Sequence, residues 1–138
     1  MILLDTSGLL AAIDSGQRKH RQAAECLAAA RPPMLLSPFV LAELDHLLLS
    51  RVGEGARTSL LREVQRGAYL LEPMAGVDVA RALEIIERHA DLGISLADAS
   101  IVVLAERHRI RDVLTLDERH FRVLQAGGKP FRLLPVDA

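Results

Sequence analysis

Five short apolar runs alternate with longer amphipathic segments along the chain, and this alternation constrains the fold more than any other feature. The segments between the runs carry apolar residues at helical spacing. Strands that alternate with helices are typical of an α/β domain whose mostly parallel sheet is covered on both faces. Half of the 138 residues are apolar, which is ample for one core, so we expect a single domain over residues 1–138. The predicted strands are Met1–Leu4, Met34–Leu36, Ala68–Leu71, Val113–Leu116 and Phe131–Leu134.

The first of these strands is the most informative. Met1–Leu4 is an unbroken apolar run, as in a strand that is buried on both faces at the centre of a parallel sheet. Asp5, Thr6 and Ser7 follow it directly. Because open α/β sheets bind ligands beyond the carboxyl ends of their strands, Asp5 is a candidate site residue.

Composition argues against several other classes of protein. The net charge is −1, which gives no general positive field for nucleic acids, although every basic residue except Lys19 and Lys129 is an arginine. The single cysteine, Cys26, cannot form an internal disulfide, as is usual in a reducing compartment. No apolar run approaches the ~18 residues of a membrane span, and the first residues do not resemble a signal peptide. We therefore expect a cytoplasmic protein that does not associate with membranes.

Glu43 lies within the apolar stripe of the helix predicted after Ser37 and Pro38. A carboxylate that faces the core is costly unless it is paired or bound to a metal. From the helix alone, the simpler explanation is favoured, which is a Glu at the edge of the stripe or one paired with an Arg.

Asp98 and Asp117 are the other two candidate acids. Asp98 follows Ser95 at the spacing of a capping box, so it is either a helix cap or a site residue. The helix that it opens is apolar nearly all round over Ala99–Ala105, which predicts deep burial. Asp117 ends the fourth predicted strand, as Asp5 ends the first.

Four carboxylates assembled at one edge of the sheet would repel one another unless a cation neutralised them. Mg²⁺ and Mn²⁺ favour oxygen ligands, and the hydroxyls of Thr6, Ser7 and Thr115 could orient the acids or hold water. A divalent metal among carboxylates suits phosphodiester hydrolysis, because it activates water and stabilises charge on phosphate oxygens. None of the four acids belongs to a local metal-binding motif, so the fold must assemble the site.

Four blocks of sequence, in order along the chain, resemble those of PIN-domain ribonucleases, and most closely the VapC-type toxins of toxin–antitoxin pairs. The blocks are Leu3–Ser7, Leu41–Leu44, Leu96–Ala99 and Leu114–Phe121. The resemblance implies a three-layer α/β/α fold with a five-stranded parallel sheet in the order 3-2-1-4-5. It also implies that Asp5, Glu43, Asp98 and Asp117 are catalytic and bind Mg²⁺ or Mn²⁺. Asp117 matches the position that varies most in the family.

The same resemblance implies an activity and partners. PIN-domain toxins are metal-dependent endoribonucleases of type II toxin–antitoxin systems, and they often cut tRNA or rRNA. The expected products carry 5′-phosphate and 3′-hydroxyl ends. The family implies a homodimer and a cognate VapB-type antitoxin, which inserts a C-terminal segment into the acidic groove. Acids without a suitable histidine pair favour this metal route, so His46 and His120 are interpreted as surface groups or as groups behind the acids.

Other interpretations of the acids fit less well. A haloacid-dehalogenase-type phosphotransferase needs an Asp where Ser7 stands, and a response-regulator receiver needs a late Lys after a strand, whereas Lys129 lies in a predicted turn. The stronger alternative is a PIN fold that binds RNA or protein without cleavage. Degenerate members of that kind usually lose acids, and this chain keeps all four.

Overall fold

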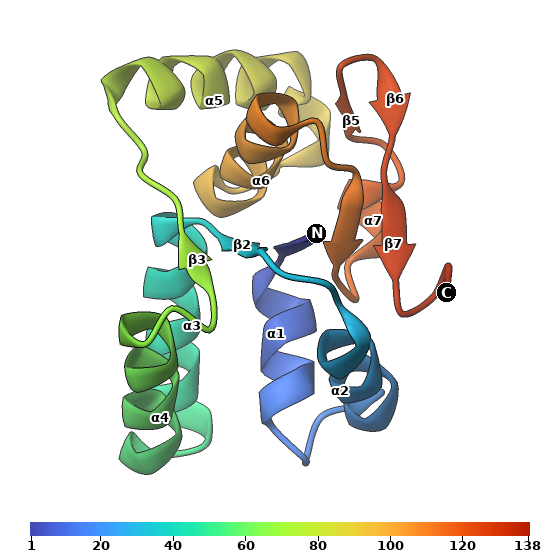
Figure 1. Ribbon diagram of the computed structural model, residues 1–138. Helices are drawn as coiled ribbons and strands as arrows, with labels where there is room; N and C mark the ends of the chain where they lie inside the picture. The colour runs from blue at the N-terminus through green and yellow to red at the C-terminus, as the bar shows by residue number, and fades with distance from the viewer.

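The computed structural model describes residues 1–138, and five parallel strands form its central sheet in the order β3-β2-β1-β4-β7 (Figure 1). Every pairing in this sheet is parallel. Because β7 is the fifth strand of the sheet along the chain, the predicted order 3-2-1-4-5 is confirmed. The strands are β1 (Ile2–Leu4), β2 (Met34–Leu36), β3 (Leu70–Leu71), β4 (Asp112–Leu114) and β7 (Arg132–Leu134).

Helices cover both faces of the sheet, which gives the predicted three layers. Figure 1 shows the first four helices on one side of the sheet and α5 and α6 on the other. The helix α6 is buried at every residue from Ala97 to Ala105, as its apolar sequence predicted. None of the helices has the length and apolar character that a membrane crossing requires. The helices are α1 (Thr6–Ile13), α2 (His20–Ala29), α3 (Pro38–Arg51), α4 (Glu54–Gln65), α5 (Gly76–Arg88), α6 (Leu96–His108) and α7 (Glu118–Phe121), with a short 3-10 helix η1 (Ala90–Leu92).

The main departure from the sequence prediction is a small hairpin before the last strand. β5 (Gln125–Ala126) and β6 (Lys129–Pro130) pair in antiparallel fashion where only a turn was expected. Gly127 and Gly128 both have positive φ, +57° and +75°, and this conformation permits a two-residue connection between the strands. The hairpin lies outside the main sheet and leaves its order unchanged.

The start of α1 lies unusually close to the end of β4, at Gly8. A Cβ atom at this position would lie 2.2 Å from the carbonyl oxygen of Leu114 and 2.7 Å from the backbone nitrogen of Thr115. Only glycine permits this approach, since real Cβ atoms do not come so near to backbone. The close packing brings the residues after β1 next to those after β4.

A pair of hydroxyls joins the helices on the two sides of the sheet. Ser37 accepts a hydrogen bond from the backbone N–H of Phe39 and so caps α3, as predicted. Its hydroxyl oxygen also lies 2.6 Å from that of Ser100 on α6, and both side chains are buried. This contact fixes α3 and α6 relative to each other at the edge of the sheet where the candidate acids lie.

Candidate active site

The four acids singled out from the sequence line one groove of about 370 Å³ at the carboxyl edge of the sheet. Asp5 follows β1 and Asp117 opens α7, while Glu43 comes from α3 and Asp98 from the first turn of α6. The fold therefore collects side chains from four separate elements. The other residues that line the groove are Thr6, Ser7, Leu10, Gln17, Leu47, Arg51, Ser95 and Leu116.

Asp5 is held in place by two hydroxyls. The side chains of Ser7 and Thr115 both donate to its Oδ2 atom, at 2.7 and 2.6 Å. These hydroxyls are themselves fixed, because the backbone N–H of Leu116 donates to Ser7 and that of Asp117 donates to Thr115. No hydrogen bond reaches the other carboxylate oxygen of Asp5, Oδ1. That oxygen is left available for a cation.

Burial makes the ionised form of Asp5 unfavourable. The residue is 4% exposed, and its separation from water raises the pKa to about 6. The hydrogen bonds from Thr115 and Ser7 act in the opposite direction, and the nearby charges of Asp98 and Asp117 raise the pKa further. A bound cation would reverse this balance and keep Asp5 ionised.

Asp98 combines the two roles that its sequence context left open. Its backbone N–H donates to the Ser95 hydroxyl, and its Oδ2 accepts from the Ser95 backbone N–H, so it completes the predicted capping box. The residue is also buried, at 9% exposure, and it lines the groove. Burial raises its pKa. Asp98 is thus both a helix cap and a groove carboxylate.

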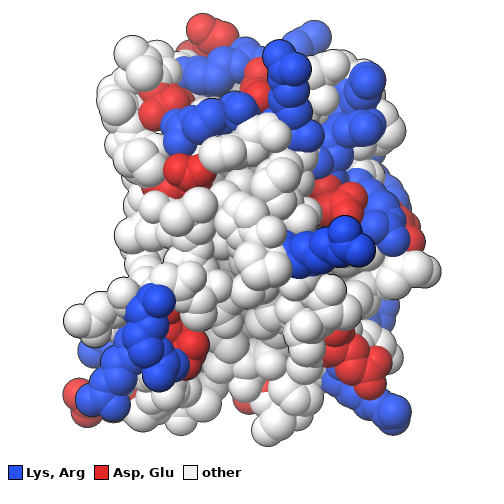
Figure 2. All heavy atoms as spheres, viewed as in Figure 1, with Lys and Arg blue, Asp and Glu red and all other residues white.

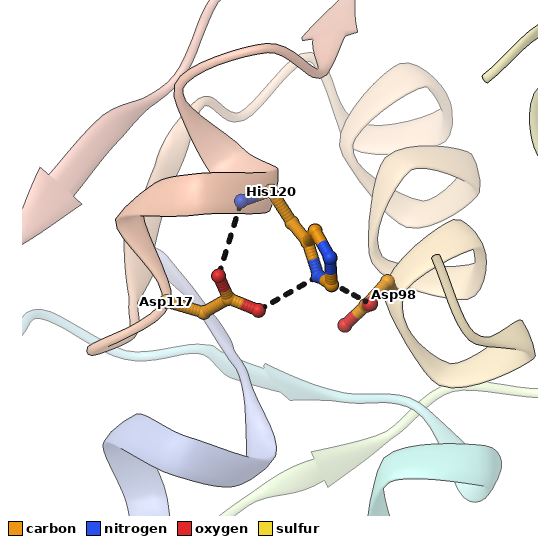
Figure 3. Close-up of side chains that lie close together, drawn as sticks. All are labelled: Asp98, Asp117 and His120. Carbon is orange, nitrogen blue, oxygen red and sulfur yellow. Dashed lines mark hydrogen bonds and ion pairs between the residues drawn. The ribbon is translucent and has the colours of Figure 1, made fainter. Parts of the chain in front are cut away.

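His120 lies between Asp98 and Asp117 (Figure 3). Its Nδ1 atom is 2.8 Å from an oxygen of Asp117 and 3.2 Å from one of Asp98, yet this buried nitrogen satisfies hydrogen-bond geometry with neither. Asp117 also caps α7 by accepting from the His120 backbone N–H at 3.0 Å. The ligand atoms of these three residues all lie within 4.8 Å of one another. Of the two positions expected for His120, the structure shows the one behind the acids, where it forms the tightest cluster of possible ligands with Asp98 and Asp117.

Glu43 lies in the groove, but the reason given for it from sequence is wrong. The prediction placed Glu43 among the core-facing residues of α3, whereas its side chain is exposed. The buried residues of this helix are Val40, Leu44 and Leu48, and Glu43 lies beside this stripe rather than within it. It reaches the groove because α3 borders it, and it forms no ion pair.

The three hydroxyls expected to support the acids have different surroundings. Ser7 and Thr115 position Asp5 through the two hydrogen bonds to its Oδ2 atom. Thr6 lines the groove, but its buried hydroxyl has no hydrogen-bond partner. A buried polar group without a partner is unusual and is consistent with a ligand or water bound nearby.

The donor groups in the groove fit a hard divalent cation. His120 is the only side chain that forms an ion pair with any of the four acids, and no Lys or Arg does so. The carboxylate oxygens of the four acids suit Mg²⁺ or Mn²⁺. Asp5 and Glu43 lie outside the tightest cluster, which holds Asp98, Asp117 and His120.

Sequence reasoning missed Gln17 and Arg51 as residues of this region, and for His120 it left open a surface position and a position behind the acids. A signal for His120 was present, because it follows Asp117 at a spacing that places both on one face of a helix. Gln17 belongs to the connection between α1 and α2, and Arg51 ends α3. Neither position has a local pattern that predicts a place in the groove.

Several of the Arg residues on the surface are paired with neighbouring acids. Arg21 pairs with Glu25, Arg57 with Asp45, Arg66 with Glu63, Arg107 with Asp78 and Arg122 with Asp137. Figure 2 shows the consequence on one face of the molecule, where basic and acidic atoms lie side by side over most of the charged areas. The excess of Arg therefore forms no continuous basic surface on this face.

Comparison with known proteins agrees with the fold. The family model for the PIN domain matches residues 2–125. Ribonuclease VapC26 of Mycobacterium tuberculosis is 40% identical to the chain over 135 residues, which are 97% of this chain and 100% of that protein.

Comparison with solved structures finds the same fold in three other proteins. The crystal structure of VapC20 of M. tuberculosis, described as a toxin that cleaves the sarcin–ricin loop, has a TM-score of 0.79 and 25% identity, and covers 85% of this chain and 90% of its own. A toxin–antitoxin complex from Klebsiella pneumoniae has a TM-score of 0.68 and 19% identity, and covers 90% of this chain and 92% of its own. FitAcB from Neisseria gonorrhoeae shares the fold with a TM-score of 0.53, 19% identity and coverage of 79% of this chain and 83% of its own. The chain therefore belongs to the PIN-domain family and is a homologue of the VapC proteins, as its sequence motifs predicted.

Proposed function

We propose that this protein is a metal-dependent endoribonuclease, the toxin of a type II toxin–antitoxin system. The observation that carries the proposal is the convergence of Asp5, Glu43, Asp98 and Asp117 on one groove with no Lys or Arg to pair them. The homology to a ribonuclease and to a ribonucleolytic toxin supports the choice of RNA as substrate. Its RNA would be tRNA or rRNA, the class of target common in the family.

The four acids would together hold Mg²⁺ or Mn²⁺, with Asp117 completing the site. The free Oδ1 of Asp5 suits this role, since its other oxygen is occupied by hydroxyls. When bound, such a metal lowers the pKa of water and stabilises negative charge on phosphate oxygens.

The chain's own residues prepare the groove for the reaction. Ser7 and Thr115 fix the orientation of Asp5, and the first turn of α6 fixes Asp98 through Ser95. The amino ends of α1 and α6 carry Asp5 and Asp98, so the helix dipoles favour negative charge there. The acids would position water for in-line attack on phosphorus, with the ribose 3′ oxygen as leaving group. The products would then carry 5′-phosphate and 3′-hydroxyl ends.

We further propose two protein partners. One is a VapB-type antitoxin that covers the acidic groove, and the Klebsiella relative, which is a toxin–antitoxin complex, supports it. The other is a second copy of this chain. Exposed apolar side chains on α3, α4, β3 and α5 support a partner surface, among them Leu49, Leu61, Leu70, Leu71 and Leu83.

The activity is tested with purified protein and total bacterial RNA in Mg²⁺ or Mn²⁺. Asp5→Asn and Asp98→Asn should each lower the rate of cleavage by a factor of about 100 or more, because each removes a charge from the groove. Asp45→Asn is the matched control, since Asp45 lies on α3 close to Glu43 but pairs with Arg57 outside the groove. Equal activity in all three variants would contradict the proposal. If the wild-type protein bound RNA without cleaving it, a PIN-fold binding module would be favoured instead.

A further inference from the structure

A second hollow, of about 330 Å³, adjoins the acidic groove. The two share Leu116, and Gln17 lines the groove while the next residue, Arg18, lines the second hollow. Thr115 also contributes, and its hydroxyl binds Asp5. A polynucleotide whose scissile phosphate lay in the acidic groove would thus continue directly into this pocket. We call it the flanking pocket, lined by Arg18, Lys19, Thr115, Leu116, Glu118, Pro135 and Val136.

Arg18 and Lys19 give the flanking pocket a positive charge that is not used within the chain. Both side chains are exposed, and neither forms an ion pair or a side-chain hydrogen bond. They differ in this from the paired Arg residues elsewhere on the surface. The one acid of the pocket, Glu118, lies 3.3 Å from Arg122, so its charge is already partly balanced. Two free cations beside an acidic groove suit the phosphate that neighbours the one being cut.

The segment that presents these cations is ordered by its own hydrogen bonds. The carboxylate of Asp14 accepts from the Gly16 backbone N–H and the Gln17 side-chain amide, each at 3.0 Å. Lys19 has a left-handed backbone, with φ +60° and ψ +21°, which is uncommon for a residue other than glycine. Strain of this kind is often kept where a side chain must point in a particular direction.

One wall of the flanking pocket is apolar and is also held in place. Pro135 and Val136 form it together with Leu116. The next residue, Asp137, accepts hydrogen bonds from Arg122 at 2.6 and 2.8 Å and from the Leu133 backbone N–H at 2.7 Å. These bonds lower the pKa of Asp137 to about 2, so the wall stays anchored at neutral pH. The pocket is therefore formed before any ligand binds.

We propose that the flanking pocket binds an unpaired nucleotide next to the scissile phosphodiester, with Arg18 and Lys19 on its phosphate and the apolar wall against its base. This inference rests on the proposed function. The volume lies within the range of ligand pockets of about 300–1,000 Å³. An apolar wall can receive a base only when the base is unstacked and free of its pairing partner. The preferred substrate is therefore a single-stranded loop or end of RNA rather than a duplex.

The first experiment measures binding of a fluorescein-labelled single-stranded RNA of mixed sequence by anisotropy, in the Asp5→Asn protein so that no cleavage interferes. The double substitution Arg18→Ala/Lys19→Ala should raise Kd by about tenfold, because it removes charge-assisted hydrogen bonds to phosphate. It should also make the slope of log K against log salt concentration shallower by about 0.7 for each phosphate that is no longer neutralised. Arg62→Ala/Arg88→Ala is the matched control, because it removes two exposed, unpaired cations from outside both hollows and should change Kd by less than about twofold. Equal effects of the two double substitutions would overturn the proposal.

The second experiment repeats the titration with a duplex RNA of the same length and with a strand that lacks its bases. The decrease in affinity in the Arg18→Ala/Lys19→Ala protein should be largest for the intact single strand. Equal decreases on all three ligands would show that only phosphate is bound and would refute the bound nucleotide. Failure of the proposed function is recognised separately, since the wild-type protein would then leave every RNA uncut.

Discussion

Asp5 is the residue whose chemistry the fold changes most. Its pKa rises from 3.8 to about 6 in the folded protein, chiefly through burial. Because one pKa unit corresponds to about 1.4 kcal/mol, the ionised form of Asp5 destabilises the folded protein by roughly 3 kcal/mol. Because the folded pKa is the higher one, this cost is fully present above pH 6 and disappears as pH falls toward 3.8. In EDTA, lowering the pH from 7 to 5 should therefore relieve about 1 kcal/mol of it.

Chemical denaturation at the two pH values, with Asp5→Asn beside the wild type, measures this effect. Asparagine keeps an oxygen that can accept from Ser7 and Thr115 but carries no charge. The difference in stability between the two proteins should shrink as the pH falls. A difference that stayed constant from pH 7 to pH 5 would mean that Asp5 is ionised in the folded protein at both.

His120 is the residue that links two of the acids, and its substitution should affect the groove without affecting the core. In His120→Asn, Asp98 and Asp117 would face each other without the imidazole between them. We expect cleavage to fall by a factor of about 10–100, as for other partners of metal ligands, and a higher Mn²⁺ concentration to be needed for half-maximal rate.

The control for His120 is His46→Asn, because the exposed His46 side chain lies on α3 and is not among the residues that line the groove. Equal rates in the two variants at every Mn²⁺ concentration would show that His120 has no role in the groove.

At the scale of secondary structure, the packing of α1 against β4 determines whether the groove forms. Gly8→Ala would place a methyl group 2.2 Å from the carbonyl oxygen of Leu114, so α1 must move away from β4. The 2.6 Å bond from Thr115 to Asp5 spans this same junction and should break. We expect thermal melting to show a destabilisation of roughly 3 kcal/mol, the upper end for overpacked sites, together with loss of cleavage.

A matched substitution is available in α4. Gly55 has no atom within 4 Å of an added Cβ and lies in the first turn of that helix, so Gly55→Ala should leave stability unchanged or raise it by up to about 1 kcal/mol. If the Gly8→Ala protein melted at the same temperature as the Gly55→Ala protein, the close approach of α1 to β4 would not be required for the stability of the fold.

The elements also show which parts of the molecule could be predicted from sequence. The covered parallel sheet followed from the buried apolar runs, because a strand buried on both faces and an all-apolar helix each have few alternatives. The strand order came only from the resemblance to the family. Asp5, Asp98 and Asp117 were found because they end strands or open a buried helix. Glu43 was found for a wrong reason, since a stripe assigned by spacing alone is uncertain by one position.

Other features depend on packing between distant segments. Nothing near Gly8 indicates that Leu114 will lie against it, and the joint role of Ser7 and Thr115 arises only when α1 meets β4. Arg18 and Lys19 lie in a connection without periodicity, so their place beside the groove could not be inferred from their neighbours in sequence.

For the whole molecule, the exposed apolar side chains predict self-association. Leu70 and Leu71 form the edge strand β3 and both are exposed, as is Leu83 on α5. Light scattering at micromolar concentration should report twice the 15.1 kDa mass of one chain. Leu83→Glu should shift the species toward a single chain by placing a charge in the interface, whereas Val123→Glu, on another part of the surface, should not. A measured mass of one chain for the wild-type protein would contradict the proposed dimer.

The chemical nature of the new RNA ends tests the central claim most directly. If the carboxylate groove hydrolyses RNA through water held with a divalent metal, the upstream fragment must end in a 3′-hydroxyl and the downstream fragment in a 5′-phosphate. The upstream fragment should then be extended by poly(A) polymerase without phosphatase treatment, and no cut should form in excess EDTA. A 2′,3′-cyclic phosphate, or full cleavage in EDTA, would show that the 2′-hydroxyl is the nucleophile and would contradict the role assigned to the four acids.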